Sequence, residues 1–389
     1  MKAYKFLIQP SKEQKVLIEK TFGCVRFIYN KMLSDKKDHY QETQKPLYIP
    51  PAFYKNKFPW LKEVDSLALC NAQLNLNTAY TNFFRNPKEV GFPAFKSKHK
   101  SRKSYTTNLT NNNIKITKTS IKLPKLGSVK LKQHRDFPPD IVIKHVTISC
   151  SAKGSYYVSV CFKQTIAIPS VTPETALGLD FSMSSLFIDS DNQSADYPKF
   201  YRKSQEQLAK AQRRLSKRVK GSNRYRKQQH KVALISERTA NRRKDFLHKL
   251  SNSIAKSYDL VCIEDLNMKV MSKSYHFGKS VADNGWGMFT TFLKYKLVDR
   301  GKTLVKISKW YPSSKTCSKC GTFKDELKLS ERVFICICGS VVDRDYNAAV
   351  NILKEGIEIY KAAGHAVSAQ LCCGHESARL RSPHLKALA

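Results

Sequence analysis

The stretch that decides the fold is ALGLDF at residues 176–181, a short apolar run with Asp180 at its end. A run of this length is typical of a strand that is buried in a sheet. A second such run, DLVCIEDL at residues 259–266, carries Glu264. The carboxyl ends of neighbouring parallel strands meet at one edge of an open α/β sheet. Asp180 and Glu264 are therefore expected to lie close together.

The segments around these two strands complete a recognisable order. A strand is expected in 184–192, two long helices at about 202–219 and 223–256, a helix at 286–300, a strand at 303–308 and a last helix from about 345. These segments match the RNase H-like order, which runs from a strand with Asp through a hairpin, a helix, a strand with Glu, a helix and a strand to a helix with Asp. The sequence thus predicts an α/β nuclease domain.

The last helix supplies a third carboxylate, because Asp343 and Asp345 stand at its start. Converging carboxylates repel one another unless cations lie between them. We interpret the three acids as a divalent-metal site that cleaves a phosphodiester. Each acid alone has a simpler explanation as a turn former or a helix cap, and the pattern does not decide between Asp343 and Asp345.

Charge points to a polyanionic partner. The 389 residues include 69 Lys and Arg against 31 Asp and Glu, a net charge of +38. A membrane is not expected as that partner, because no run of about 18 apolar residues occurs and the basic residues are spread along the whole chain. The N-terminus MKAYKFLIQP lacks the apolar core of a secretory signal. A nucleic-acid enzyme and a ribosomal-type basic protein both remain compatible with this composition.

The basic residues are densest in the two long helices. Residues 201–250 contain seventeen Lys and Arg against three acids. Such a surface repels itself unless phosphates bind it. A second basic stretch lies at 91–103. The candidate nucleic-acid-binding residues are Arg213, Arg214, Arg242, Arg243, Lys96, Lys98 and Arg102.

Four of the eleven cysteines form two pairs, each followed by glycine: Cys317-x-x-Cys320 and Cys336-x-Cys338. Two such turns supply the four thiolates of a structural zinc site, which leaves no open position for a substrate. The intervening residues 321–335 are too few and too polar to fold by burial alone, so four plain reduced cysteines are a poor explanation. Five others lie in apolar runs and are expected to be core thiols: Cys24, Cys70, Cys150, Cys161 and Cys262.

The N-terminal half has a different pattern. Residues 3–9 alternate as a strand, and Ser11 with Gln14 has the spacing of a capping box at the start of a helix. Helical spacing returns at 67–84, and short alternating runs at 114–165 predict a small antiparallel β-unit. A domain boundary is expected at 169–175.

Several motifs together resemble the TnpB (OrfB) proteins of insertion sequences, which are relatives of the type V CRISPR effectors. The resemblance covers about residues 1–355. The motifs are GLDFS at 178–182, CIEDLN at 262–267, YPSSKTCSKCG at 311–321 and DRDYNAAVNIL at 343–353, with TFGCVRFIYNKML at 21–33 and GFPAFKSKHKSRKSY at 91–105. The short Cys-x-Cys pair and the residues after Gly364 depart from the family pattern.

The resemblance implies a multidomain α+β protein whose RuvC nuclease domain has the catalytic residues Asp180, Glu264 and Asp345. Asp345 is the third acid because it stands in the Asp-x-Asn-Ala-Ala motif. The implied domains are a wedge-like β-barrel (1–10 and 105–170), a helical recognition domain (11–104), the nuclease domain (175–308 and 340–360), a zinc ribbon (309–339) and a flexible tail (361–389).

The implied function is RNA-guided cutting of double-stranded DNA, with magnesium at the acids, zinc at the cysteines and a guide RNA as cofactor. A prokaryotic cytoplasmic location is expected, at the nucleoid during action. Two alternatives stay open: an RNA-guided repressor that does not cut, and a transposase that joins DNA ends without a guide.

Overall fold

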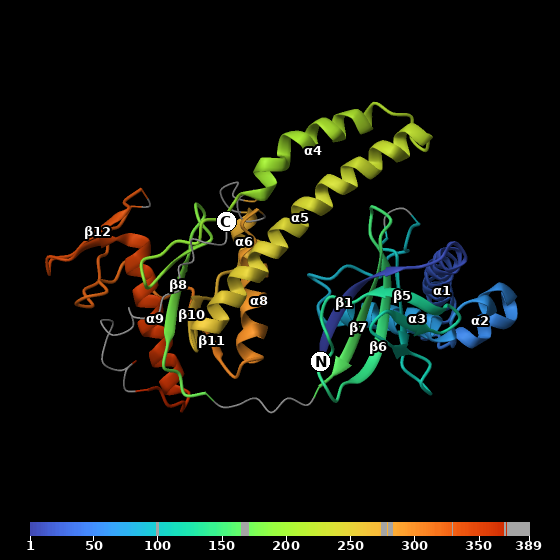
Figure 1. Ribbon diagram of the computed structural model, residues 1–389, viewed down its shortest axis with the longest axis horizontal. Coiled ribbons are helices and arrows are strands. Elements are labelled where there is room, and N and C mark those ends of the chain that lie inside the picture. Colours follow the sequence, from blue (N-terminus) through green and yellow to red (C-terminus); the bar gives the residue numbers. More distant parts are fainter. Residues whose placement is uncertain are drawn as a thin grey trace. The chain divides into compact units, whose positions relative to one another are not determined.

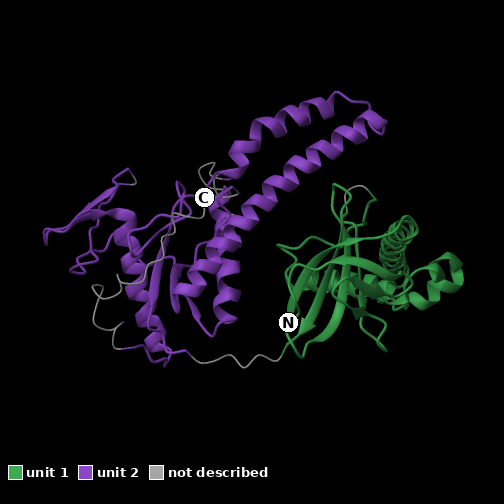
Figure 2. Cartoon of the chain, in the orientation of Figure 1, with its two compact units in different colours: residues 1–166 green, residues 167–389 purple. Residues whose placement is uncertain are grey.

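A computed structural model describes residues 1–98, 101–164, 171–273, 278, 283–328, 330–368 and 371. The chain divides into two compact units, residues 1–166 and 167–389 (Figure 2). Most of the predicted tail, including Cys372 and Cys373, lies outside the described residues. The C-terminal end of the predicted β-barrel segment, 165–170, also lies outside the described residues.

The first unit is built on an antiparallel sheet of seven strands with the order β2-β6-β7-β1-β5-β4-β3. Alternating side chains such as Val158, Val160 and Phe162 point into its core, as the period-2 pattern predicted. The strands are β1 (Lys2–Gln9), β2 (Ser104–Asn108), β3 (Lys115–Ile116), β4 (Ser120–Leu123), β5 (Gly127–Lys132), β6 (Val142–Cys150) and β7 (Tyr156–Lys163).

Helices pack beside this sheet (Figure 1). The capping box at the start of α1 is confirmed: the Ser11 side chain accepts from Gln14 N, and the Gln14 side chain accepts from Ser11 N. Two short helices, which the sequence did not predict, connect α1 to α3. The helices of this unit are α1 (Lys12–Thr43), α2 (Pro51–Lys57), the 3-10 helix η1 (Pro59–Glu63) and α3 (Ser66–Arg85).

The second unit contains a four-stranded sheet of the order β11-β10-β8-β9. Strands β8, β10 and β11 are parallel to one another, and β9 is antiparallel to β8. The strands and helices follow one another along the chain in the order that the sequence predicted. These strands are β8 (Ala176–Phe181), β9 (Phe187–Asp189), β10 (Leu260–Glu264) and β11 (Thr303–Ile307).

Helices cover both faces of the second sheet. Leu177, Leu179 and Val261 pack against the C-terminal half of α5 and against α8, whereas Ala176 and Cys262 pack against α9. Side chains alternate between the faces of a strand, so Asp180 and Glu264 project from the face that α9 covers. The helices of this unit are α4 (Phe200–Ser216), α5 (Asn223–Ser257), α6 (Met268–Lys273), α8 (Trp286–Val298) and α9 (Arg344–Ala362).

Two glycines allow α9 to lie directly on the strands. A Cβ atom at Gly178 would lie 2.2 Å from the carbonyl oxygen of Ala349, and one at Gly356 would lie 2.3 Å from Cys262 Sγ. Real Cβ atoms do not approach other atoms this closely. Glycine is therefore required at both positions for the observed packing of α9 on β8 and β10.

Helices α4 and α5 form a hairpin that extends beyond the sheet (Figure 1). Its seam is narrow. Gln228 Nε2 donates to Ala211 O at 2.9 Å, Thr239 Oγ1 donates to Ser204 Oγ at 2.9 Å, and Ala211 is the one buried residue of α4. The hairpin is stabilised mainly by the pairing of its own two helices.

The sequence prediction was wrong at one cysteine. Cys24 and Cys262 are buried, and Cys150 and Cys161 are partly buried, but Cys70 is exposed on α3. It follows Leu69, which is fully buried, so Cys70 lies about 100° around the helix from the apolar stripe.

Candidate active site and metal-binding cluster

Asp180 and Glu264 end two adjacent parallel strands, which pair in register at Leu179 and Ile263. Burial raises the pKa of Asp180 well above its usual value, and the negative charges of Glu264 and Asp345 raise it further. Burial also raises the pKa of Glu264. The three predicted acids therefore interact electrostatically at the carboxyl edge of the sheet.

The two acids at the start of α9 have different surroundings. Asp343 is exposed and is the N-cap: its Oδ1 accepts from Asp345 N at 2.9 Å and from Tyr346 N at 3.0 Å. Asp345 lies in the first turn of α9 with 19% of its side chain exposed, and Arg344 Nη2 lies 3.3 Å from its Oδ1. Because Asp343 is exposed and committed to capping, whereas the charge of Asp345 raises the pKa of Asp180, the geometry favours Asp345 as the third acid.

A serine that the sequence analysis did not single out contacts the second acid. Ser313 Oγ donates a hydrogen bond to Glu264 Oε1 at 2.7 Å. This bond opposes the effect of burial on the pKa of Glu264. Ser313 lies four residues before Cys317, the first residue of the cysteine cluster. The segment that contacts Glu264 therefore leads directly into that cluster.

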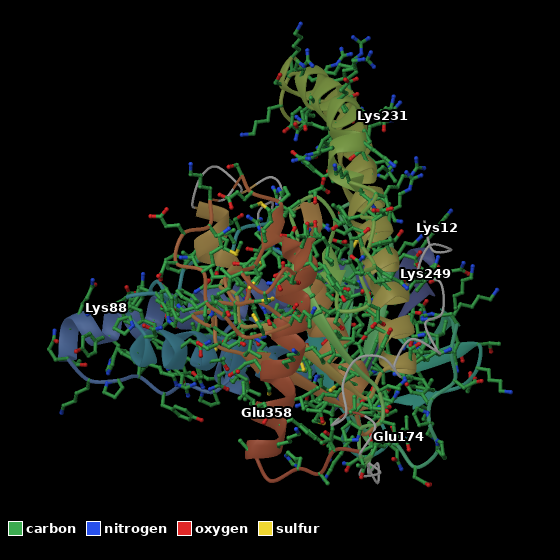
Figure 3. The ribbon with its side chains drawn as sticks, turned by 90° about the vertical axis from the view of Figure 1, so that its left-hand side faces the viewer. Lys12, Lys88, Glu174, Lys231, Lys249 and Glu358 are labelled. Atoms are coloured by element: carbon green, nitrogen blue, oxygen red, sulfur yellow. The ribbon has the colours of Figure 1, made fainter. Side chains whose placement is uncertain are left out.

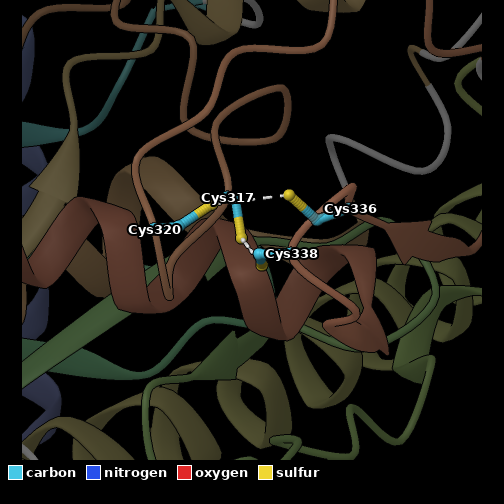
Figure 4. A group of neighbouring side chains, drawn as sticks. All are labelled: Cys317, Cys320, Cys336 and Cys338. Carbon is cyan, nitrogen blue, oxygen red and sulfur yellow. Dashed lines mark hydrogen bonds between the residues drawn. The ribbon is translucent and has the colours of Figure 1, made fainter.

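The four predicted cysteines converge (Figure 4), and their sulfur atoms all lie within 4.8 Å of one another. Cys317 Sγ lies 3.7 Å from Cys338 Sγ, and Cys320 Sγ lies 3.5 Å from Cys336 Sγ. These separations are too long for disulfides. They are close to the ~3.8 Å edge of a tetrahedron with zinc–sulfur distances of about 2.3 Å. The cluster therefore fits a four-thiolate metal site.

Local structure around the cysteines also suits metal binding. Gly321 and Gly339 have φ of +79° and +80°, which the tight turn after each pair requires. Hydrogen bonds with Thr322, Cys338 and Cys336 lower the pKa of the Cys320 thiol, whereas hydrogen bonds with its cysteine neighbours raise the pKa of Cys336. The thiolate is the form that binds metal. The second pair lies in the turn between two short strands, β12 (Val333–Ile335) and β13 (Val341–Asp343), and Phe334 of β12 packs against Cys317 and Cys336.

The acidic site differs from the cysteine cluster in its spacing. Within the described part of the chain, the cysteines are the one group of three or more His, Cys, Asp or Glu ligand atoms that lie within 4.8 Å of one another. The three carboxylates are therefore more widely spaced. A donor set made of carboxylate oxygens suits a hard divalent cation such as Mg²⁺.

Basic side chains cover the α4–α5 hairpin. Of the seventeen Lys and Arg at 201–250, sixteen are exposed, including Arg213, Arg214 and Arg242, whereas Arg243 is partly buried. In Figure 3, Lys231 and Lys249 are labelled on α5, and many side chains along this helix end in nitrogen atoms. Asp245 forms an ion pair with Lys249. The three acids of residues 201–250 nevertheless cannot neutralise the seventeen Lys and Arg of the same segment.

In the first unit the candidate basic residues differ from one another in exposure. Lys98 and Arg102 are exposed. Lys96 Nζ lies 3.8 Å from the centre of the Tyr29 ring, and burial lowers its pKa. A cavity of about 350 Å³ has Lys96, Arg102 and Arg26 among its lining residues, so three cations line one cavity of the first unit.

Comparison with known proteins identifies the family. The chain is 35% identical to a candidate RNA-guided DNA endonuclease of Streptomyces pristinaespiralis, over 92% of this chain and 89% of that protein. It is 31% identical to the candidate RNA-guided DNA endonuclease InsQ of Escherichia coli (strain K12), over 96% of this chain and 94% of that protein. This chain belongs to the TnpB (OrfB) family. A TnpB-like protein of Acanthamoeba polyphaga mimivirus is 35% identical over 37% of the chain and 27% of that protein.

Three family descriptions match segments of this TnpB-family chain. Residues 159–275 match OrfB of IS605, described as "Probable transposase", and residues 286–352 match the Cas12f1-like TNB domain. Residues 1–45 match a helix-turn-helix domain, although here they form one strand and one long helix, β1 and α1.

Among solved structures, the chain resembles a Cas12f1 protein seen with single-guide RNA and target DNA. The TM-score is 0.57 at 16% identity, over 88% of this chain and 83% of that one. At this identity the likeness shows a shared mixed α/β fold. In the described residues, no helix combines the length and the apolarity that crossing a membrane requires.

Proposed function

We propose that this TnpB-family protein is an RNA-guided DNA endonuclease with catalytic residues Asp180, Glu264 and Asp345. The observation that carries the proposal is the placement of the three acids: Asp180 and Glu264 stand on adjacent parallel strands, on the face that α9 covers, and Asp345 stands in the first turn of α9. Relatives that match nearly the whole chain bear the name of candidate RNA-guided DNA endonucleases. The site and the family thus lead to the same chemistry.

The three carboxylates would hold magnesium, which when bound activates a water molecule and stabilises the leaving oxygen. The chain's own residues prepare that site. Ser313 fixes one oxygen of Glu264, Arg344 offsets part of the charge of Asp345, and the Asp343 cap holds the first turn of α9. Partial burial of Asp180 would limit how far water screens its interaction with the metal.

Zinc at Cys317, Cys320, Cys336 and Cys338 would hold residues 309–339 together as a zinc ribbon. The carboxylates take no part in that cluster, so the zinc is structural in this proposal. We further propose that the seven-stranded sheet of the first unit forms the wedge-like β-barrel, that 11–104 form the recognition domain and that 175–308 with 340–360 form the nuclease domain.

Guide RNA and target DNA would bind the basic surfaces through their phosphates. The exposed cations of the α4–α5 hairpin supply one such surface, and the cavity lined by Lys96 and Arg102 supplies another. Base pairing with the guide would select the target sequence. The prokaryotic relatives support action in the cytoplasm, at the nucleoid.

The decisive experiment is cutting of a plasmid with a target matched to the RNA that co-purifies with the protein. Magnesium-dependent cutting that disappears after RNase treatment is expected. The family description "Probable transposase" favours one rival, a strand-transfer enzyme, which would join DNA ends without RNA. Binding of guide and target without any cutting would support a repressor instead.

A further inference from the structure

The turn at residues 311–316 connects the acidic site to the cysteine cluster. Ser313 is buried, with 6% of its surface exposed, and its hydroxyl donates to Glu264 Oε1 at 2.7 Å. Backbone bonds within the turn, from Ser313 N to Tyr311 O and from Thr316 N to Pro312 O, fix its shape. Cys317 follows immediately. The position of the serine hydroxyl therefore depends on the conformation of the segment that begins the cysteine cluster.

Two buried asparagines of α9 hold this turn. Asn351 Nδ2 donates to Ser313 O at 2.7 Å and to Thr316 O at 2.6 Å. Asn347 Nδ2 donates to Thr316 O at 2.7 Å, and its Oδ1 accepts from Ser318 N at 2.8 Å. Asn347 is fully buried and Asn351 is 3% exposed. Such amides are costly to bury unless they are hydrogen-bonded, so these bonds specify one position of the turn on α9.

The same helix carries Asp345 in its first turn. Helix α9 thus presents one acid directly, and through Asn351 and Ser313 it orients a second acid on β10. A free Glu side chain samples several rotamers. A hydrogen bond to Oε1 restricts the carboxylate and leaves Oε2 available for a metal ion.

We propose that Ser313 is a positioning residue for Glu264, and that the metal-loaded cysteine cluster maintains this position through the 313–318 segment. The inference rests on the proposed function, since it concerns the affinity of the acidic site for its divalent cation. Partners that orient metal ligands typically contribute about 10–100-fold in metal affinity. Loss of Ser313 or of the cysteine-bound metal should therefore weaken cation binding at a site to which neither contributes a ligand.

The test measures Mn²⁺ binding by electron paramagnetic resonance to the full chain, freed of nucleic acid by high salt. Binding that disappears in Asp345→Ala is assigned to the acidic site. Ser313→Ala should weaken this binding about 10–100-fold, and Ser313→Thr, which keeps the hydroxyl, should restore most of it. Zinc content and the melting temperature should stay near wild type in both variants.

Ser314→Ala is the matched control, because the side chain of Ser314 makes no hydrogen bond within the described residues; it should bind Mn²⁺ like wild type. Cys336→Ser tests the second half of the proposal and should also weaken Mn²⁺ binding. Wild-type Mn²⁺ affinity in Ser313→Ala would overturn the positioning role, and wild-type affinity in zinc-depleted Cys336→Ser would overturn the link to the cluster. No Mn²⁺ binding by wild type would instead overturn the proposed function, and this inference with it.

Discussion

The contact between Gly178 and α9 offers the sharpest test of how the fold assembles the acidic site. Gly178 lies two residues before Asp180, and a Cβ atom there would lie 2.2 Å from Ala349 O and 2.8 Å from Leu353 Cβ. Gly178→Ala therefore cannot be accommodated by rotation of a flexible side chain. Helix α9 must move away from β8 by about 1 Å before these atoms reach ordinary contact distances.

That displacement predicts two separate losses. Overpacking of this kind costs about 1–3 kcal/mol in the free energy of unfolding, which in a unit of this size lowers the melting temperature by roughly 2–4 °C per kcal/mol. Because α9 carries Asp345, the acid moves with it, and a 1 Å misplacement at a reacting centre costs about 100-fold in rate. Binding of guide RNA should change little, since the basic surfaces lie elsewhere.

The assay compares the melting temperature, guide RNA affinity and single-turnover cutting of Gly178→Ala with those of wild type. Gly23→Ala is the control: Gly23 lies in α1 with no atom within 4 Å of an added Cβ, and Ala in place of Gly within a helix stabilises by up to about 1 kcal/mol. Wild-type stability and full cutting by Gly178→Ala would refute the view that close packing of α9 sets the geometry of the acids.

Three further predictions concern the acids, the cysteines and the charge. Asp180→Ala, Glu264→Ala and Asp345→Ala should each abolish plasmid cutting while gel shifts still show guide and target binding. Asp343→Ala, which removes only the cap, should cost about 1 kcal/mol of stability with little loss of cutting; cutting by Asp345→Ala would contradict the assignment. Purified protein should contain about one zinc per chain by atomic emission, and Cys336→Ser should lose it; full occupancy in that variant would exclude Cys336 as a required ligand. Changing Arg213, Arg214 and Arg242 together to Ala should reduce the slope of log affinity for guide RNA against log salt by about 2–3, and an unchanged slope would place these side chains away from the RNA.

The elements that the sequence predicted well are those with strong local periodicity. The strand ending at Asp180, the strand carrying Glu264 and the two long helices all occur near their expected residues. The capping box at Ser11 needs only residues three apart, and it is present. The spacing of the cysteines predicted their convergence, because a two-pair motif with glycine after each pair closes locally.

The features that the sequence did not predict depend on contacts between distant segments. Ser313 and Glu264 are 49 residues apart, and no local pattern marks a serine as a partner of a carboxylate. Asn347 and Asn351 did carry a weak signal in the sequence. Asn351 interrupts the apolar run AAVNIL, and Asn347 directly precedes that run. Burial of polar side chains on the packed face of a helix indicates that they hold another segment.

Helix α9 explains why the acids, the asparagines and the glycines occur together. Its N-terminus presents Asp345, its buried face holds the turn before Cys317, and Gly178 and Gly356 let it approach the strands that carry Asp180 and Glu264. An error in any of these contacts displaces at least one carboxylate relative to the others. Burial, and then the negative charges of Glu264 and Asp345, raise the pKa of Asp180, so the packing of α9 on the strands must offset the cost of holding these acids together. Under the proposed function, this packing preorganises the three carboxylates for a divalent cation at some cost in stability.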